Sequence, residues 1–433
     1  MHAESRRDFV RYSAGTVAGV NALPATLRAG RNDVLRAAVL GVNGRGRSHI
    51  AAFEKQAGVD VVVLCDPDEQ VLNQRAQAFA ETYNRSVETE TDLRKVLDRK
   101  DIDIVSVATP NHWHALATIW ACQAGKDVYV EKPGSHNIFE GRKMIEAAHK
   151  YHRIVQHGVQ LRSSPALQEG VAHLRKGLIG EVYMARGLVF RWRPSIGNAP
   201  NEAHPPQHLD WSLWQGPASE RDFSKRLVHY NWHWHWDYGN GDVGNQGIHE
   251  TDMCQWGLDV QLPSEIGAMG GKFLWDDDKE TPEILTTLYS FPEEKKLIQF
   301  EVRHWCTNTE QGATVGNIFY GSEGVMVIKG YGTYETYLGR NREPGPKRSE
   351  SGELDQHFSN FVEAVRTRDR DHLNGPVETA HYSSALAHLG NIAYRLKRQL
   401  HFDPERERFV DDTEADSMLT RNYREPFVVP RRV

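Results

Sequence analysis

A segment of 24 residues, HYNWHWHWDYGNGDVGNQGIHETD from His229 to Asp252, gathers side chains that could bind a ligand or transfer a proton. It contains four histidines, three tryptophans and three aspartates. If its first part is a strand, His233, His235 and Asp237 share one face, because successive strand side chains point to opposite faces. These three residues are candidate contacts for a polar substrate.

Two other interpretations are open for the same segment. A His-x-His pair on one strand face suits zinc or another divalent ion, with His249 or Asp252 as the third ligand. Histidines that line a polar cleft are commoner than metal ligands, so no metal is expected. The alternating tryptophans could stack on sugar rings or pack into a core, and alternation on one side favours the core.

The rest of the segment predicts a turn followed by a helix. The stretch GNGDVGN, residues 239–245, is rich in residues that tolerate positive φ. The stretch QGIHETDMCQWGL, residues 246–258, has helical spacing, since His249, Met253 and Trp256 recur at three or four residues. His249 should therefore lie close to the N-terminal end of a helix.

A glycine-rich turn far upstream predicts a dinucleotide site. The expected strand at 34–42, VLRAAVLGV, runs directly into GVNGRGRSH and a helix, which is the context such a site requires. The first glycine permits a tight turn, the last lets the helix pack close to the strand, and the helix N-terminus can hold a pyrophosphate. The middle glycine of the usual pattern is replaced by Asn43, with Gly44 beside it. The residues expected at the cofactor phosphates are Gly41, Asn43, Gly44, Arg45 and Gly46.

An acidic residue after the next strand strengthens this prediction. The run VDVVVLCDPD is continuously apolar, as expected for a strand buried on both faces, and it leads into Asp66. A carboxylate at this position can accept hydrogen bonds from both ribose hydroxyls of the adenosine and repels a 2′-phosphate. NAD is therefore expected rather than NADP.

Strands and helices continue to alternate up to about residue 157, which predicts a doubly wound parallel sheet. Ligands of such sheets bind beyond the carboxyl ends of the strands. Two strand ends should therefore face the cofactor, one with Thr109 and Asn111 and the next with Glu131 and Lys132. A lysine that only closes a surface turn is the alternative for Lys132.

The second half of the chain has a different pattern. Longer, alternating strand-like runs such as EVYMARGLVFRW and KLIQFEVRHW predict a mainly antiparallel sheet with one face covered. Residues 339–353, GRNREPGPKRSESGE, are expected to form a polar loop. Two helical segments follow. The fold class is thus α/β, with a Rossmann domain at 33–157 and an α+β domain with a large antiparallel sheet at 158–433.

Several motifs in this order resemble the glucose-fructose oxidoreductase, inositol dehydrogenase and rhizopine-catabolism family (Gfo/Idh/MocA). They are the glycine turn, ATPNHWH, VYVEKP and VQLRSSPALQEGVAHLRKGLIGEV. The resemblance implies that Lys132 lies beside the nicotinamide and contacts the substrate, and that Asn111, His114 and Glu131 line the cofactor site. It also implies that the second domain binds the substrate, with Arg162 as a further candidate contact, and that the chain forms a homodimer or homotetramer.

The family's counterpart of residues 245–249 usually reads D-x-G-x-H, so the resemblance makes His249 the residue that accepts or donates the substrate's hydroxyl proton. The alternative is a histidine bonded to backbone at a helix N-terminus. Asn245 departs from the pattern, because an amide forms hydrogen bonds but takes no proton. Either His249 acts alone, or Lys132, Asp237 or Asp242 supplies the missing function.

The N-terminal segment and the overall charge bear on location and partners. SRRDFVR, followed by a weakly apolar stretch, resembles a twin-arginine export signal, with a disordered basic tail as the alternative. Residues 1–32 are therefore excluded from the fold, and a periplasmic or otherwise exported protein is expected. A formal net charge of −6 argues against nucleic acid as a partner, and no apolar run is long enough to span a membrane. The four cysteines form no CxxC pair and are expected to be buried thiols.

These observations predict an NAD-dependent oxidoreductase that acts on a hydroxyl of a sugar, a polyol or a glycoside. An exported enzyme meets no NAD pool, so its cofactor should be tightly bound and recycled in each turnover. One alternative is an NAD-dependent glycosidase, which oxidises the glycoside transiently, eliminates the aglycone, adds water and returns the hydride. Another is a protein that holds NAD without turnover.

Overall fold

The computed structural model describes residues 34–199, 204–350 and 354–433. The expected export signal lies outside these residues. Residues 35–433 form one compact unit. None of the described helices is long and apolar enough to cross a membrane.

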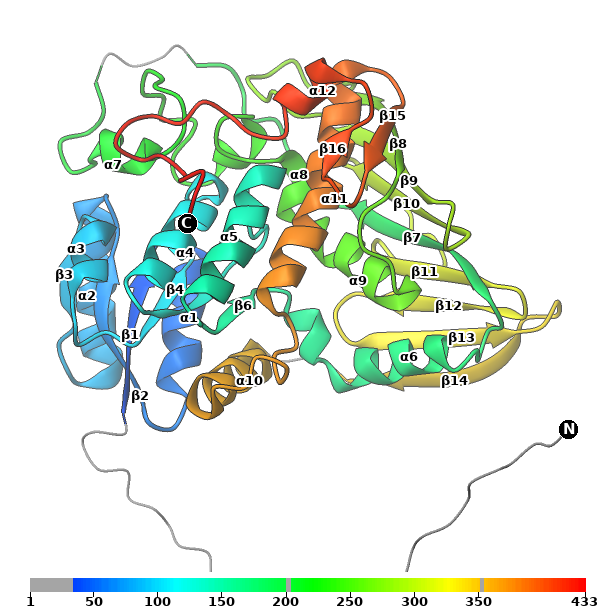
Figure 1. The fold of residues 1–433 in the computed structure, drawn as a ribbon, viewed down its shortest axis with the longest axis horizontal. Helices are drawn as coiled ribbons and strands as arrows, with labels where there is room; N and C mark the ends of the chain where they lie inside the picture. Colours follow the sequence, from blue (N-terminus) through cyan, green and yellow to red (C-terminus); the bar gives the residue numbers. More distant parts are fainter. Residues whose placement is uncertain (1–33, 200–203, 351–353) are drawn as a thin grey trace, which may run out of the picture. The chain divides into compact units, whose positions relative to one another are not determined.

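The first sheet has six parallel strands in the order β3-β2-β1-β4-β5-β6, which confirms the doubly wound prediction. Its strands are β1 (Leu35–Leu40), β2 (Val59–Cys65), β3 (Glu88–Glu90), β4 (Ile104–Val107), β5 (Asp127–Val130) and β6 (Val155–His157). The helices between them are α1 (Arg45–Glu54), α2 (Glu69–Tyr83), α3 (Leu93–Asp98), α4 (Asn111–Gln123) and α5 (Ile138–Lys150). All residues of β4 and β5 are buried, because helices cover both faces of the sheet (Figure 1).

The second sheet has ten strands in the order β14-β13-β12-β11-β7-β10-β9-β8-β15-β16. Its strands are β7 (Val182–Phe190), β8 (Glu265–Gly271), β9 (Ile284–Phe291), β10 (Lys296–Arg303), β11 (Val315–Gly321), β12 (Gly324–Lys329), β13 (Thr333–Leu338), β14 (Glu343–Ser349), β15 (Leu400–Asp403) and β16 (Arg408–Phe409). Among the described strands of this sheet, only β7 and β10 pair in parallel, so the mainly antiparallel sheet is confirmed.

Three helices cover one face of the second sheet (Figure 1). They are α6 (Pro165–Arg175), α9 (Ile248–Leu258) and α11 (Val377–Leu396). A further helix, α10 (Leu354–Thr367), packs instead on the first sheet, where the ring of Phe358 stacks on Tyr129 with the centroids 4.1 Å apart. The chain therefore returns to the first domain after building most of the second sheet.

The structure corrects three predictions of local structure. The stretch NWHWHWDY is not a strand, because residues 231–234 form a 3-10 helix and lie in no sheet. The expected turn at 239–245 contains a short helix, α8 (Gly241–Asn245). The expected polar loop at 339–353 contains β14, which forms one edge of the second sheet. Prolines 344 and 346 are tolerated there, because an edge strand leaves half of its backbone groups unpaired.

The aromatic alternation of NWHWHWDY resembles a strand pattern because Trp232 and Trp234 are both buried, although they pack in different places. Trp232 and Trp234 are 8% and 2% exposed, and Trp232 packs with Trp214, Phe223 and Tyr238. The core interpretation of the tryptophans thus holds for these two. All four cysteines are free thiols, and three of them are buried as expected, whereas Cys306 is partly exposed.

Candidate active site

A cavity of about 300 Å³, the first cavity, lies at the carboxyl ends of the first sheet's strands. Residues 204–240, here called the strap, leave the second domain and cover these strand ends (Figure 1). The strap contains α7 (Trp211–Gln215) and the 3-10 helix. Twelve of the candidate residues named from the sequence line the cavity: Gly41, Asn43, Gly44, Arg45, Asp66, Thr109, Asn111, His114, Glu131, Lys132, His233 and Asn245.

The glycine turn has the geometry that its residues predict. Gly41 has a φ of +80°, and a Cβ there would lie 2.7 Å from the Ala108 carbonyl oxygen. A Cβ on Gly46 would lie 1.9 Å from the Gly41 carbonyl oxygen, so only glycine lets α1 approach β1 this closely. Gly44 precedes α1 without a side-chain cap, which leaves the helix N-terminus available to an anion.

Asp66 lies beside this turn and is held by backbone groups. Its carboxylate accepts hydrogen bonds from the backbone N–H groups of Val42, at 2.9 Å, and Asp68, at 3.1 Å. Burial raises the pKa of Asp66 to about 6, and the two backbone donors oppose that rise. Each oxygen keeps a lone pair that a ribose hydroxyl can meet.

Two polar atoms further along the wall have no partner. Thr109 Oγ1 and Asn111 Nδ2 are buried without a hydrogen bond, although both residues line the cavity. Orphaned polar atoms of this kind are satisfied by a ligand or by water. Together with the glycine turn and Asp66, they show that the residues present fit a dinucleotide.

Glu131 anchors the central part of the site. Its carboxylate accepts hydrogen bonds from Arg45 Nε at 2.6 Å and from the backbone N–H of Lys132 at 3.1 Å, and it lies 3.0 Å from His49 Nε2. Burial alone would raise the pKa of Glu131, but Arg45 and His49 hold it well below its usual value. An ionised Glu131 therefore fixes the turn that carries Lys132.

His114 has a positioning role in this structure. Its ring nitrogens lie 2.6 Å from the Pro133 carbonyl oxygen and 2.7 Å from the Thr109 carbonyl oxygen. Burial lowers the pKa of His114, so the ring is neutral and donates one of these hydrogen bonds at a time. It links the ends of β4 and β5, which carry the two groups of candidate residues.

Lys132 and Asn245 meet across the two domains. The Lys132 ammonium donates a hydrogen bond to the backbone carbonyl of Asn245, at the end of α8. Burial lowers the pKa of Lys132, while Glu131 opposes that effect. The candidate catalytic lysine is thus held between the cofactor domain and the helix that leads to His249.

Asp242 supplies the negative charge that Asn245 lacks. The Asn245 amide donates to the Asp242 carboxylate at 3.4 Å, and Arg193 grips both oxygens of that carboxylate at 2.8 and 2.9 Å. Burial opposes ionisation, but the His304 ring and Arg193 keep the pKa of Asp242 below its usual value. Of the alternatives named from the sequence, Asp242 is therefore the acid that lies next to Asn245, where the family pattern has an aspartate.

His249 lies on the first turn of α9, as the sequence predicted. It is 5% exposed, its Nδ1 has no hydrogen-bond partner, and the edge of its ring faces Tyr331 with the centroids 5.6 Å apart. Burial and the nearby Lys132 charge lower the pKa of His249 to about 3. His249 is not among the residues that line the first cavity, so its catalytic role stays a prediction.

Three candidate substrate contacts lie away from the first cavity. Arg162 is held by Asp252 at 2.8 to 3.1 Å. His235 is buried with its Nδ1 3.2 Å from Glu280, and unlike His233 it does not line the first cavity. The backbone carbonyl of Asp237 accepts from Arg421.

The metal interpretation assumed that His233 and His235 share one face of a strand, and the structure has no strand there. Within the parts of the chain that the structure describes, no group of three or more histidine, cysteine, aspartate or glutamate side chains is placed to hold a metal ion.

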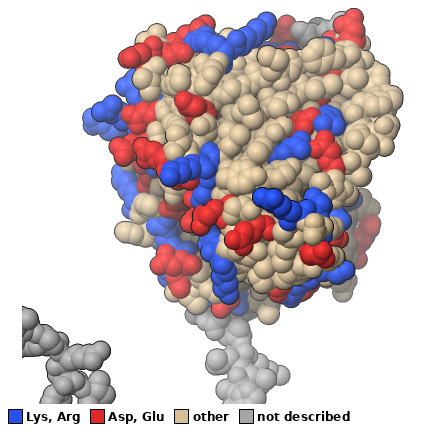
Figure 2. Space-filling view, turned by 90° about the vertical axis from the view of Figure 1, so that its right-hand side faces the viewer, with Lys and Arg blue, Asp and Glu red and all other residues tan. Residues whose placement is uncertain are grey.

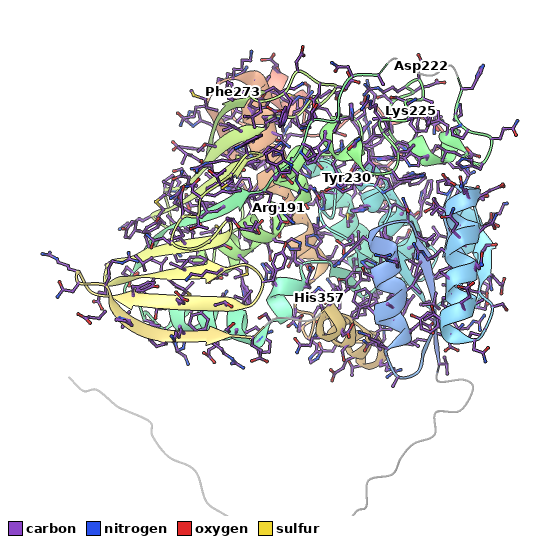
Figure 3. The ribbon with its side chains drawn as sticks, turned by 180° about the vertical axis from the view of Figure 1, so that it is seen from behind. Arg191, Asp222, Lys225, Tyr230, Phe273 and His357 are labelled. Carbon is purple, nitrogen blue, oxygen red and sulfur yellow. The ribbon has the colours of Figure 1, made fainter. Side chains whose placement is uncertain are left out.

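Of the residues that the strap contributes, sequence reasoning named only His233 as a candidate contact. Leu213, Trp214, His229, Tyr230 and Trp232 all line the first cavity. The hydroxyl of Tyr230 accepts hydrogen bonds from Arg193 at 3.1 Å and Asn245 at 3.5 Å. Figure 3 shows Tyr230 in the region between the first domain and the second sheet. No local motif marks these residues, because their position depends on where the strap docks.

The strap is fastened to the first domain along its length. Asp68 lies 3.0 Å from ring nitrogens of both His208 and His229. His112 and Trp113 of α4 hydrogen bond to the Trp214 carbonyl at 3.0 and 3.2 Å. A ligand in the first cavity is consequently covered by chain on the side away from the sheet.

Fold and site together define a two-domain protein with a dinucleotide site between a Rossmann sheet and a mainly antiparallel sheet. The model of an oxidoreductase family with an NAD-binding Rossmann fold matches residues 35–159, and that family's C-terminal alpha/beta domain matches residues 179–272 and 345–429. The chain belongs to the Gfo/Idh/MocA family.

Curated relatives are similar over part of their length. A glycosyl hydrolase family 109 protein of Shewanella sp. (strain W3-18-1) is 36% identical over 129 residues, which cover 29% of this chain and 28% of that protein. A second, from Saccharopolyspora erythraea, is 29% identical over 163 residues, 36% of this chain and 35% of that protein. The chain thus matches about a third of the length of these relatives.

Solved structures share the fold over most of the chain. The aldose-aldose oxidoreductase of Caulobacter crescentus, complexed with glycerol, has a TM-score of 0.65 at 17% identity and covers 85% of this chain and 100% of its own. The WlbA dehydrogenase of Bordetella pertussis, in complex with NADH and UDP-GlcNAcA, has a TM-score of 0.65 at 17% identity and covers 86% and 99%.

Proposed function

We propose that this protein is an NAD-dependent oxidoreductase that acts on a hydroxyl of a sugar, a polyol or a glycoside. One observation carries the proposal. A single cavity joins the glycine turn and Asp66 to Lys132 and Asn245. It thereby offers an acid for ribose hydroxyls, a helix N-terminus for phosphates, and a lysine from the strand end that faces the second domain.

NAD bound there would take up a hydride from the carbon that bears the hydroxyl and could return it. The chain's own residues would manage the proton. A lysine whose pKa is lowered by burial exchanges protons more readily near neutral pH, so Lys132 would bind the substrate oxygen and help to move the hydroxyl proton away from it. His249, neutral at neutral pH, would accept that proton. His233, Tyr230 and Asn245 would contact the substrate.

The strap favours a cofactor that stays bound through turnover. It covers the first cavity and is held by Asp68, His112 and Trp113. We further propose that residues 1–32 are a twin-arginine signal, since that route carries folded, cofactor-loaded proteins. Changing Arg6 and Arg7 together to lysine should then leave the protein in the cytoplasm, as cell fractionation would show; unchanged export would refute the signal.

A glycosidase that uses the same cofactor is a second candidate. It is favoured by the similarity to glycosyl hydrolase family 109 proteins. Transient oxidation of a hydroxyl acidifies the neighbouring C–H, a base removes that proton, the aglycone leaves, water adds, and the hydride returns. The extra base would come from His229 or His233, the two histidines of the strap that line the first cavity.

One experiment separates the candidates. Purified protein is given aryl glycosides and free sugars in turn, with no nicotinamide added. Absorbance at 340 nm that grows with free sugars supports the oxidoreductase, whereas release of nitrophenol from a nitrophenyl glycoside supports the glycosidase. Bound NAD with no response to either panel would refute both and favour a protein that holds NAD without turnover.

A further inference from the structure

A second cavity of about 270 Å³ lies on the other side of the strap and shares no lining residue with the first. Its walls come from the end of the strap, the residues before α5, the helix α11 and the segment 417–421. The residues used below are His136, Trp236, Asp237, Asn240, Asn391 and Arg421. The cavity is far larger than the ~30 Å³ that one water molecule occupies.

The second cavity is lined by buried polar atoms without partners. Asn240 Oδ1 and Asn391 Oδ1 have no hydrogen bond, and each of these residues is only 5% exposed. Arg421 Nε has none either. Native proteins rarely leave such atoms unpaired, so they indicate something that completes them.

The histidine on this wall adds a second unpaired donor. His136 Nδ1 lies 3.3 Å from Arg421 Nη1, which can only donate, so Nδ1 accepts. Burial holds the pKa of His136 well below its usual value, and the neutral ring therefore carries its proton on Nε2. That N–H is buried and has no partner.

The unpaired atoms are thus two acceptors, the amide oxygens of Asn240 and Asn391, and two donors, Arg421 Nε and His136 Nε2. This combination restricts the kind of ligand that can pair with all of them. An anion cannot pair with the two amide oxygens, and a cation cannot pair with the guanidinium and imidazole N–H groups. A hydroxyl both donates and accepts, so a molecule with several hydroxyls satisfies all four.

Two arginines, Arg421 and Arg395, line the second cavity, and their positive charges face Asp237, 3.7 Å from Arg421, and Glu280. The Arg395 guanidinium carbon lies 5.2 Å from the centroid of the Trp236 ring, so one face of that ring is already covered.

We propose that the second cavity binds a neutral polyhydroxylated molecule of the monosaccharide class. This site shares no lining residue with the first cavity. The proposal therefore does not depend on the reaction proposed above.

The bound sugar would have a short physical connection to Lys132. Asn240 is the residue directly before α8, and Asn245 at the end of that helix accepts the hydrogen bond of the Lys132 ammonium. Asn240 is also tied to α11, since its carbonyl accepts from Asn391 at 3.0 Å. A sugar bonded to Asn240 therefore acts on the element that positions the lysine, as an effector would.

The test counts sugars on the NAD-loaded protein. D-glucose, N-acetyl-D-glucosamine and myo-inositol are titrated by calorimetry, and crystals are soaked in the same compounds. We expect density in the second cavity bonded to Asn240 and Asn391, and one bound sugar fewer per chain in Asn391→Leu. The matched control Asn308→Leu, at an exposed asparagine, should keep the full number.

A second variant covers the case that Asn391→Leu fails to fold. Ser417 is exposed at the rim of the second cavity, so Ser417→Trp should block the cavity without disturbing the core and should also lose one sugar. Only water in the cavity of soaked crystals, or an unchanged number of bound sugars in both variants, would overturn the proposal. The count requires no turnover, so failure of the proposed reaction would leave this test intact.

Discussion

At the scale of single residues, the acid expected at position 245 has a substitute one helical turn earlier. Asp242 lies three residues before Asn245 on α8, and the two side chains are hydrogen-bonded at 3.4 Å. Arg193 neutralises much of that charge, which leaves Asp242 better suited to orient its neighbours than to accept a proton. Although Asn245 replaces the usual aspartate, a negative charge is still present nearby, on Asp242.

The lysine and histidine make the first prediction. Lys132→Met and His249→Gln should each lower kcat by roughly 10²- to 10⁴-fold, the range for a positioned proton-transfer group. NAD content, read by absorbance after denaturation, should stay near one per chain. Lys176→Met, at an exposed lysine, is the control and should keep full activity. Near-normal turnover in either site variant would refute that residue's role.

Asp66 predicts a pH dependence of cofactor binding. Its carboxylate accepts ribose hydroxyls only when ionised, and burial raises its pKa to about 6. The affinity of cofactor-stripped protein for NAD should therefore be full above this pH and fall by about tenfold per pH unit below it. The same shift means that the empty fold loses stability as the pH rises through about 6.

Calorimetric titration with NAD between pH 5 and 8 checks this dependence. Asp66→Asn carries no titrating group at this position, so its affinity should be weaker and flat over the same range. A fall of equal steepness in that variant would assign the effect to another group.

The sequence predicted the residues of the first cavity that belong to strand ends; of the strap it named His233 and missed Leu213, Trp214 and Tyr230. Gly41, Asp66 and Lys132 each follow a buried strand of a parallel sheet, and the topology of such sheets brings these ends together. Tyr230 reaches the same cavity from a segment without regular strand structure. Its position depends on contacts with Asp68 and α4 that no local pattern encodes.

At the scale of elements, α1 packs against the turn after β1 at a position where only glycine fits. Gly46→Ala would place a Cβ 1.9 Å from the Gly41 carbonyl oxygen. The helix must shift, so the variant should lose roughly 1–3 kcal/mol of stability and much of its affinity for NAD. Thermal unfolding of the cofactor-free protein measures the first effect.

The turn provides its own control. A Cβ on Gly44 would meet nothing within 4 Å, so Gly44→Ala should lower the unfolding temperature of the cofactor-free protein less than Gly46→Ala does. Equal destabilisation by both variants would show that the loss reflects general sensitivity of the turn rather than helix packing.

Alternation of apolar and polar residues predicted a strand correctly only where a partner strand lies beside the segment. The alternation in residues 284–291 and 296–303 corresponds to β9 and β10, which pair with each other along their whole length. The alternation in NWHWHWDY has no such partner strand; Trp232 packs beside Trp214 and Tyr238, and Trp234 packs against His304. The period of hydrophobic residues shows which side chains are buried. Whether the backbone there is a strand or a helix depends on tertiary contacts.

At the scale of the whole molecule, the uncovered face of the second sheet presents few charges over a broad area (Figure 2). Leu288 of β9 and Met269 of β8 share this face and are 44% and 83% exposed. Trp192 and Trp305, which follow β7 and β10, are 53% and 46% exposed and contact each other. Monomeric proteins rarely leave extended apolar patches open, so we expect a second copy of the chain to cover this face.

A charge on that face should separate the copies. Leu288→Glu is expected to shift the protein from dimer or tetramer towards monomer in sedimentation velocity at micromolar concentration. The control is Gln74→Glu, which adds the same charge at an exposed position on α2 in the first domain. A wild-type protein that sediments as a monomer would refute the expectation directly.

The fastening of the strap also sets an order of events during synthesis. Arg424 donates hydrogen bonds to the carbonyls of Gly216 and Ser212, and the ring of Phe427 packs against Trp113 with the centroids 5.4 Å apart. At ~5–20 residues per second, a ribosome makes β1 to β6 many seconds before it reaches Arg424, while α10 reaches the first sheet only after residue 367. The nascent Rossmann sheet is therefore open to the cytosolic nucleotide pool for that interval, and the late clamp closes over whatever has bound. Cofactor identity would then be decided while the chain is still being made.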